Sequence, residues 1–347
     1  MKRKIILSLC ASFILYSCTD DDVLDRSLQD SSDNLGIEVV EVSGGNIVCG
    51  TRAQQEGQLA LKFDSETSFA KFKSALLYES SLERTLSVSK YGVENLYDLA
   101  EEADDELELI GDNVSTIAEF KARYADYKQK YAGLLVVDSS DSTDLSLYVP
   151  KDNAIESYIA NKEGYYVVGN EVRKINVSSD DTQSRHLAKV KLAASQEGTI
   201  AGTNKIIFRP ASGKKIYFEA YAQDAYIRVK MSAKKHMWYG WKNDPHRQYF
   251  FDSYLNNFVY LAQGKYGQDV VVDRLPRYIF NSSVKNGFDI ILGKRQTSNK
   301  VTGEFHVWCD YTSEHDKDGN DITEKVGDFV IPKCLESKAQ IVKVEIQ

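Results

Sequence analysis

The spacing of the hydrophobic residues differs between the two halves of this chain, and this difference limits the folds that it can adopt. Between residues 64 and 159 large apolar residues recur every three or four positions, which is typical of amphipathic helices. Beyond residue 186 apolar and polar residues alternate in short runs between turn residues, which is typical of antiparallel strands. The sequence therefore predicts an α+β fold, with an N-terminal helical domain that has a small sheet and a hairpin, and a C-terminal antiparallel β-sandwich.

The expected elements follow the same two patterns. Short strands are expected over 37–63 and a hairpin over 165–175. Helices are expected over 64–77, 93–109, 116–131 and 154–159. A capping box at Thr116 and Glu119 marks the start of the third helix. The second half is expected to be rich in strands, with one short helix over 249–261.

Charge is divided unevenly along the chain. Residues 181–347 carry 25 Lys and Arg against 19 Asp and Glu, a net charge of +6, which leaves −14 for residues 1–180 because the whole chain carries −8. This asymmetry predicts two domains, over 37–178 and 186–347, joined by a polar linker. It permits either electrostatic attraction between the halves or an anionic partner for the second half.

The N-terminus has the pattern of an export signal. Lys2, Arg3 and Lys4 precede an apolar run, Ile5 to Tyr16, that is too short to span a bilayer. The segment Leu15-Tyr16-Ser17-Cys18 resembles a lipobox, which implies a signal peptide over 1–17 and acylation of Cys18 as the first residue of the mature chain. Acyl chains on Cys18 would make the membrane a partner. The alternative is an ordinary secretory signal followed by a chance cysteine.

The residues after Cys18 predict a flexible acidic tether over 18–36. Asp20, Asp21 and Asp22 follow the cysteine, and the segment to Asn34 is rich in Asp and Ser. An acidic cluster behind a lipidated cysteine resembles the surface-export signal of Bacteroidota-type lipoproteins. That resemblance implies anchoring in the outer membrane with exposure at the cell surface. Nucleic acid is not expected as a partner, because an exported protein rarely meets it.

Three segments of the first half extend this resemblance over roughly residues 37–176. They are EGQLALKFDSETSFAKF, NLYDLAEEADDELE and KEGYYVVGNEV. Their order of strand, helices and hairpin resembles the N-terminal part of uncharacterised Bacteroidota surface lipoproteins that are assigned to domains of unknown function. The resemblance concerns packing residues and implies no activity.

One stretch of the second half is a candidate ligand-binding strand. In YIRVKMSAKKHMWYGW, residues 226–241, a continuous strand would place Ile227, Val229 and Met231 on a core face. The opposite face would present the candidate ligand-binding residues Arg228, Lys230, His236 and Trp238, together with Lys234. Cations beside a flat aromatic ring suit an acidic sugar. The alternative is a solvated sheet face with Trp238 packed under a loop.

No pattern for catalysis, a cofactor or a metal is found. The segment DKDGNDITE, residues 316–324, fails the EF-hand rule because the sixth and twelfth positions hold Asp321 and Gly327. His306, Trp308 and Asp310 share a strand face near His315 but match no metal-site spacing, so His306 is expected to be structural. Catalytic, cofactor-binding and metal-binding residues are therefore predicted as none.

The function predicted first is a non-catalytic, lipid-anchored surface protein that binds a glycan or an envelope protein. A lipid-anchored hydrolase of polysaccharide or peptide is one alternative, and two close carboxylates in a cleft would favour it. A structural or assembly component of the envelope is another. Cys309 and Cys334 lie in strand-like segments, where they either pair or remain buried thiols.

Overall fold

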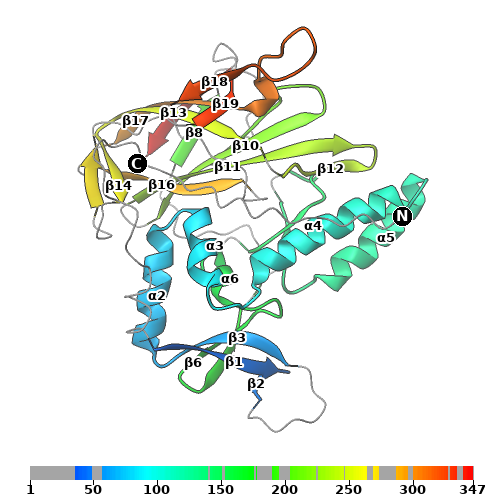
Figure 1. Cartoon of the computed structure of the whole chain (residues 1–347), viewed down its shortest axis with the longest axis vertical. Coiled ribbons are helices and arrows are strands. Elements are labelled where there is room, and N and C mark those ends of the chain that lie inside the picture. The colour runs from blue at the N-terminus through cyan, green and yellow to red at the C-terminus, as the bar shows by residue number, and fades with distance from the viewer. Residues whose placement is uncertain are drawn as a thin grey trace.

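The computed structural model describes residues 36–48, 57–139, 141–150, 153–175, 177, 190–194, 204–223, 226–245, 247–263, 269–272, 287–295, 300–326, 329–333 and 339–346. The fold is mixed α+β, as predicted, with a helical N-terminal half and an antiparallel C-terminal half (Figure 1). The predicted signal peptide, Cys18, the tether to residue 35 and the predicted linker over 178–184 lie outside the described residues. The same holds for Cys334, and Cys309 is buried.

The N-terminal half carries a five-stranded sheet at its far end (Figure 1). Its strands lie in the order β2-β1-β3-β6-β7, and β3 and β6 are parallel. Their bounds are β1 Ile37–Ser43, β2 Asn46–Ile47, β3 Gln58–Phe63, β6 Tyr165–Val168 and β7 Glu171–Lys174. The expected hairpin over 165–175 is confirmed as β6 and β7.

The helices lie on the side of the C-terminal half that faces this sheet (Figure 1). They are α2 Glu66–Tyr78, α3 Ser81–Ser89, α4 Leu96–Asp112, α5 Ile117–Lys130 and α6 Glu156–Ile159. Helices α2, α4, α5 and α6 confirm the four expected helices, and Thr116 accepts the Glu119 N–H at the start of α5. Helix α3 was not predicted, although Ser80 and Glu83 form its capping box. None of the described helices is both long and apolar enough to cross a membrane.

The C-terminal half is built on a seven-stranded antiparallel sheet. Its order is β15-β14-β16-β11-β10-β9, with β12 paired to β11 at one end. The bounds are β9 Lys205–Phe208, β10 Lys214–Gln223, β11 Tyr226–Met237, β12 Gly240–Asn243, β14 Phe258–Gln263, β15 Asp269–Val272 and β16 Phe288–Arg295. Strand β11 runs without a break through the candidate ligand-binding stretch and pairs with β10 along ten residues.

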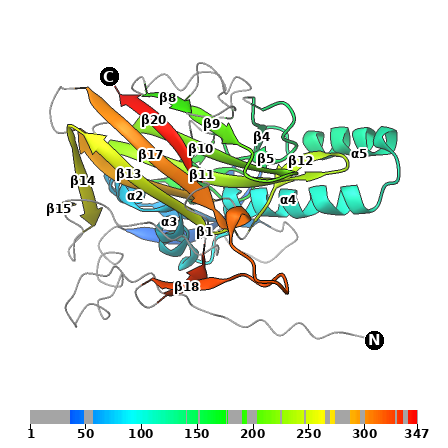
Figure 2. The same cartoon turned by 90° about the horizontal axis from the view of Figure 1, so that it is seen from above.

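A four-stranded sheet lies on the side of this sheet away from the helices (Figure 2). Its order is β13-β17-β20-β8, with bounds β13 Tyr249–Asn256, β17 Val301–Cys309, β20 Gln340–Ile346 and β8 Val190–Ala194. Two hairpins complete the fold: β4 Val136–Val137 with β5 Leu147–Tyr148, and β18 Thr323–Val326 with β19 Phe329–Pro332. The helix expected over 249–261 is wrong, because this segment forms β13 and β14.

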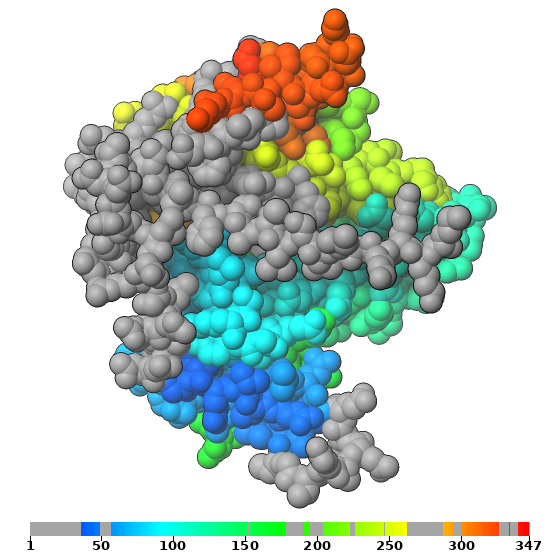
Figure 3. Space-filling view, in the orientation of Figure 1, coloured from blue at the N-terminus to red at the C-terminus, as the bar shows by residue number. Residues whose placement is uncertain are grey.

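One hydrophobic core joins the two sheets of the C-terminal half. Ile227, Val229 and Met231 of β11 point into it, as the alternation predicts, and Phe305 and Val342 enter it from the four-stranded sheet. The other face of the seven-stranded sheet is turned toward the N-terminal half. In space-filling view the blue and cyan N-terminal half lies below the yellow and orange C-terminal half (Figure 3).

A buried arginine cluster joins the two halves, and it consists of Arg84, Arg228 and Asp289. The Asp289 carboxylate accepts from Arg228 Nε at 2.8 Å and from Arg84 Nη1 at 3.3 Å. Arg228 also donates to the carbonyl oxygens of Leu77 and Glu79, between α2 and α3. Burial would raise the pKa of Asp289, but Arg228 and Arg84 hold it well below its ordinary value.

A buried lysine cluster lies further along the same sheet. Its pairs are Lys205 with Asp138, Lys215 with Asp141, and Lys234 with Asp144. The Nζ–Oδ2 distance is 2.8 Å for Lys215 and Asp141 and 3.4 Å for Lys234 and Asp144. All three aspartates belong to the N-terminal half and all three lysines to the seven-stranded sheet. The charge asymmetry of the sequence is thus partly neutralised inside the molecule.

Candidate ligand-binding groove

The outer face of the four-stranded sheet carries polar side chains in rows that cross its strands. The antiparallel register places Tyr254 of β13 beside Glu304 of β17, and Glu304 beside Lys343 of β20. The next row places Asn256 beside Thr302. Residues that face each other in register lie on the same side of a sheet, so these five side chains share one surface.

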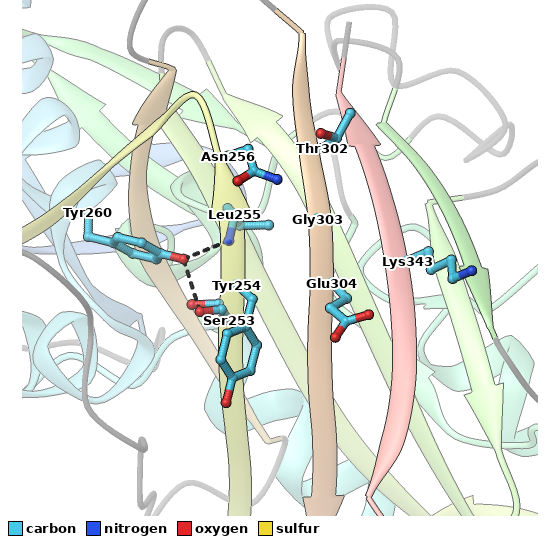
Figure 4. A pocket seen from close by; sticks show the side chains of 9 residues that line it. All are labelled: Ser253, Tyr254, Leu255, Asn256, Tyr260, Thr302, Gly303, Glu304 and Lys343. Atoms are coloured by element: carbon cyan, nitrogen blue, oxygen red, sulfur yellow. Dashed lines mark hydrogen bonds between the residues drawn. The ribbon is translucent and has the colours of Figure 1, made fainter.

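These rows line an open hollow of about 630 Å³, which we term the outer groove (Figure 4). Its lining residues are Ser253, Tyr254, Leu255, Asn256, Tyr260, Thr302, Gly303, Glu304 and Lys343. The Tyr254 side chain is 43% exposed and the Glu304 side chain 39%. Lys343 and Asn256 are also exposed.

The backbone at the rim of the outer groove is fixed by Tyr260. Its hydroxyl donates to Ser253 O at 3.0 Å and accepts from Leu255 N at 3.1 Å, as the dashed lines of Figure 4 show. The Tyr260 side chain therefore satisfies two backbone groups of β13, the edge strand of this sheet. Asn257 makes the sharp turn into β14 with a φ of 58°.

Glycine at position 303 lets β13 and β17 approach closely beneath the outer groove. Its φ is +155°, and a Cβ atom there would lie 2.0 Å from the carbonyl oxygen of Tyr254. Any other residue would displace the backbone that carries Tyr254.

His306 lies beside the outer groove and supports two of its side chains. Its ring lies 4.9 Å from the Tyr254 ring between centroids, and its Nε2 lies 3.0 Å from Glu304 Oε1. Farther along the same face, Phe250 stacks on the buried Trp308 at 5.8 Å. One end of the face is therefore packed and the other is open.

The four ligand-binding residues predicted on β11 do not form one exposed surface. The prediction that Arg228 lies on an exposed binding face is wrong, because its guanidinium is buried in the arginine cluster. Lys230 is half-buried and lies beside a cavity of about 50 Å³ under the sheet. His236 and Trp238 are exposed, and along β11 His236 lies roughly 26 Å from Arg228, at ~3.3 Å per residue of strand.

Trp238 lies at the turn after β11 and contacts the start of helix α5. Its ring centroid is 6.1 Å from that of Phe120, and half of its surface remains exposed. The His236 ring lies 4.9 Å from the Trp241 ring. Of the predicted site residues, these two therefore remain accessible, on a different part of the molecule from the outer groove.

The remaining sequence candidates have local structural roles. Asp310 faces Arg247 at 3.5 Å, and Asp316 accepts backbone N–H bonds from Asp318 and Asn320 within its own loop. Within the described ranges, no group of three or more His, Cys, Asp or Glu side chains could hold a metal ion.

The outer groove was missed in the sequence because 249–261 was interpreted as a helix. Two signals pointed to a hairpin instead: YFFDSYLN is rich in aromatic residues, which are enriched in strands, and Asn256-Asn257 is a turn pair. His306 was identified on its strand face, but its neighbours on β13 could not be assigned without that strand.

The structure is that of an α+β protein with an open hollow on a polar sheet face. The family description "Domain of unknown function (DUF4848)" matches residues 53–231, more than half of the chain, and the protein belongs to this family. The matched segment crosses the predicted linker and ends within β11.

The chain is similar to a crystal structure of a DUF4848 family protein from Bacteroides thetaiotaomicron. The sequence identity is 19%, the TM-score is 0.32, and the match covers 79% of this chain and 95% of that one. No curated protein matches the chain.

Proposed function

We propose that this protein is a non-catalytic, lipid-anchored surface protein that binds a glycan or another envelope component in the outer groove. The observation that carries the proposal is the row of Tyr254, Glu304 and Lys343, which lies on a regular sheet and is open to solvent. An exposed aromatic ring with polar groups at fixed spacing is typical of a ligand site on a rigid scaffold.

The contrast between buried ion pairs elsewhere in the molecule and exposed charges in the outer groove supports the groove as the binding site. The arginine and lysine clusters hold their charges in buried pairs, where they serve packing. Glu304 and Lys343 lie instead on the solvent side of a sheet whose other side is the core. A sheet needs only one buried face for stability, so the composition of the outer face is available for binding.

The proposed anchor rests on the sequence of the first 36 residues. The lipobox-like segment ending in Cys18 and the acidic residues behind it support attachment to the outer membrane and exposure at the cell surface. Replacing Cys18 by Ser is expected to move the protein from the membrane fraction to the aqueous fraction. Retention of the Cys18→Ser protein in washed membranes would contradict lipid anchoring.

The finer description of the fold belongs to the same proposal. The shared core of the seven-stranded and four-stranded sheets supports an antiparallel β-sandwich in the C-terminal half. Division into domains over 37–178 and 186–347 remains a prediction from the sequence. The arginine cluster, which contains residues of both segments, would then be part of an interface between domains.

A glycan array tests the proposed function. The full chain, purified in detergent, is applied beside Tyr254→Ala and the control Trp238→Ala, which removes an exposed aromatic side chain outside the groove. Selective binding that Tyr254→Ala loses and Trp238→Ala keeps is the expected result. Loss of binding in Trp238→Ala alone would place the site at the end of β11. If the wild-type protein binds no glycan on the array, glycan binding is contradicted.

The hydrolase and assembly alternatives lack a comparable observation. Glycoside hydrolysis uses two carboxylates, and Glu304 is the one carboxylate among the described lining residues of the groove. For an assembly component the sign would be a broad apolar patch, and among the described residues the exposed large apolar side chains include Leu109 and Trp238, which lie on different elements.

A further inference from the structure

We infer that the outer groove binds an electrically neutral pyranose unit of a polysaccharide. The sugar ring would stack on Tyr254, and its hydroxyl groups would donate hydrogen bonds to the Glu304 carboxylate. This inference rests on the proposed function and narrows it to one class of ligand. It departs from the acidic sugar that the sequence of β11 suggested.

Tyr254 is held in a way that suits a platform. The backbone on both sides of it is fixed, because Tyr260 bonds Ser253 O and Leu255 N. His306 contacts the ring at 4.9 Å and an interplanar angle of 48°, while 43% of the side chain stays exposed. A ring held in this way loses little conformational entropy when the apolar C–H face of a sugar stacks on it.

The spacing of the next strand suits the hydroxyl groups of that sugar. Glu304 is the register partner of Tyr254, and neighbouring strands lie about 4.8 Å apart. This separation is about the width of one pyranose ring, so hydroxyls at the ring edge would reach the carboxylate. His306 lies within 3.0 Å of Glu304 Oε1, and no described residue hydrogen-bonds Oε2. An ionised carboxylate only accepts hydrogen bonds, and sugar hydroxyls donate them.

Donors for the sugar's oxygen atoms lie around this acceptor. Lys343 is the register partner of Glu304 on the other side, and Asn256 and Thr302 form the adjacent row. Rows on one face of a strand are about 6.6 Å apart, which is more than one pyranose ring width. A second sugar unit could therefore contact the second row.

The balance of charges in the groove favours a neutral sugar over an acidic one. Glu304 faces Lys343 in register, and Glu345 pairs with Lys300 at 2.6 Å, so the surface carries both signs in balance. A sulfate or a uronic acid would require an excess of cations, ideally with bidentate Arg. Arg228 and the lysine cluster, which could have supplied them, are buried in ion pairs.

The shape of the groove favours binding of a sugar unit from the interior of a polysaccharide. Its volume of about 630 Å³ lies within the 300–1,000 Å³ that is usual for ligand sites. The hollow lies over three strands of a sheet and is open to solvent (Figure 4). A polysaccharide could therefore cross it without presenting a chain end.

Affinity electrophoresis of the full chain in detergent tests this inference. The gels contain dextran, mannan, xylan or galactan as neutral probes, and heparin, chondroitin sulfate or polygalacturonate as acidic probes. The variants are Tyr254→Ala, Glu304→Gln and the control Trp238→Ala. We expect at least one neutral probe to retard the wild type and Trp238→Ala equally, and affinity to fall about tenfold or more in Tyr254→Ala and in Glu304→Gln.

The outcomes separate this inference from the proposed function. Retardation by acidic probes alone, lost in Tyr254→Ala, overturns the neutral sugar and leaves the groove as a glycan site. Unchanged affinity in Glu304→Gln overturns the role of the carboxylate. Retardation that persists in Tyr254→Ala overturns the outer groove as the glycan site. No retardation by any probe, together with no binding on the glycan array, overturns glycan binding and leaves another envelope component as the ligand of the proposed function. Thermal unfolding of each variant checks that a loss of binding is not a loss of folding.

Discussion

The seven-stranded and four-stranded sheets share one core, but their outer faces differ completely. The outer face of the seven-stranded sheet carries Arg228 and Lys234, and the N-terminal half covers both. Lys234 pairs with Asp144 of the N-terminal half, whereas Arg228 pairs with Asp289 of the neighbouring strand β16 and donates to carbonyl oxygens of the N-terminal half. The outer face of the four-stranded sheet carries Tyr254 and Glu304, and it remains open. Charged and aromatic residues on a strand therefore indicate a polar face, and only the neighbouring element decides whether that face packs or binds.

The largest effect is expected at Asp289, the anion of the arginine cluster. Asp289→Ala leaves Arg84 and Arg228 buried without their shared carboxylate, which should lower the free energy of unfolding by about 3–5 kcal/mol at pH 7. Urea unfolding measures this difference. A loss below about 1 kcal/mol would mean that the two halves are not held together by this cluster.

The pH dependence at Asp289 has a defined sign. Its folded-state pKa is depressed, so its contribution to stability is present above the unfolded pKa of about 3.9 and is lost as the pH falls through the folded value. The difference between the wild type and Asp289→Asn should therefore narrow below about pH 4. A difference that stays constant down to the lowest accessible pH would contradict this assignment.

Asp104 of α4 should behave in the opposite way. Burial raises the pKa of Asp104 to about 6, despite a hydrogen bond from Asn243 and the nearby Lys234. Because the folded state prefers the protonated form, ionisation destabilises the fold as the pH rises from about 4 to 6. Asp104→Asn should thus stabilise the protein by about 2 kcal/mol at pH 7 and by almost nothing at pH 4.

Urea unfolding of wild type and Asp104→Asn at the two pH values measures this prediction. Glu108→Gln is the matched control on the same helix, because hydrogen bonding by Lys242 lowers the pKa of Glu108. That control should lose stability at pH 7. A gain in Glu108→Gln, or a loss in Asp104→Asn, would show that the two carboxylates have been assigned the wrong environments.

Tyr260 tests the rim of the groove and should give a smaller effect. Tyr260→Phe keeps the ring but removes the hydroxyl that bonds Ser253 O and Leu255 N. We expect a loss of about 1–2 kcal/mol in the free energy of unfolding and weaker polysaccharide retardation. Unchanged retardation would mean that the hydroxyl of Tyr260 does not position Tyr254.

Trp238 should give the smallest effect of this series. Half of its side chain is exposed. Its ring makes T-shaped contacts with Phe120 and Tyr239, at centroid distances of 6.1 Å and 5.5 Å. Trp238→Ala should change the unfolding free energy by less than about 1 kcal/mol and should leave glycan binding intact. Loss of binding in this variant would favour the β11 site over the outer groove.

Much of the fold could be predicted from the sequence because periodicity reports local structure directly. The alternation in 226–231 placed Ile227, Val229 and Met231 on the core side, and the structure confirms this. The helix predicted over 249–261 failed because short aromatic runs suit helices and strands alike, and pairing with β17 decided the outcome.

The site was harder to predict because alternation identifies a face but not what covers it. Arg228 and Trp238 both lie in one basic and aromatic stretch, yet helix α3 and the preceding turn bury Arg228 and leave Trp238 at a hairpin end. The net charges of the two halves permitted either attraction between them or an anionic partner, and the buried lysine cluster shows ion pairs between the halves. The lysine–aspartate pairs between the halves join residues 67 to 90 positions apart, which no local pattern can match to one another.

We propose that the buried cations of β11 stabilise the interior of the protein, whereas the outer groove is open to a ligand. The most direct test compares the free energies of unfolding of Arg228→Ala and Tyr254→Ala in urea at pH 7. We expect Arg228→Ala to lower the free energy of unfolding by about 3–5 kcal/mol and Tyr254→Ala to lower it by less than about 1 kcal/mol. Equal losses, or a larger loss in Tyr254→Ala, would contradict it.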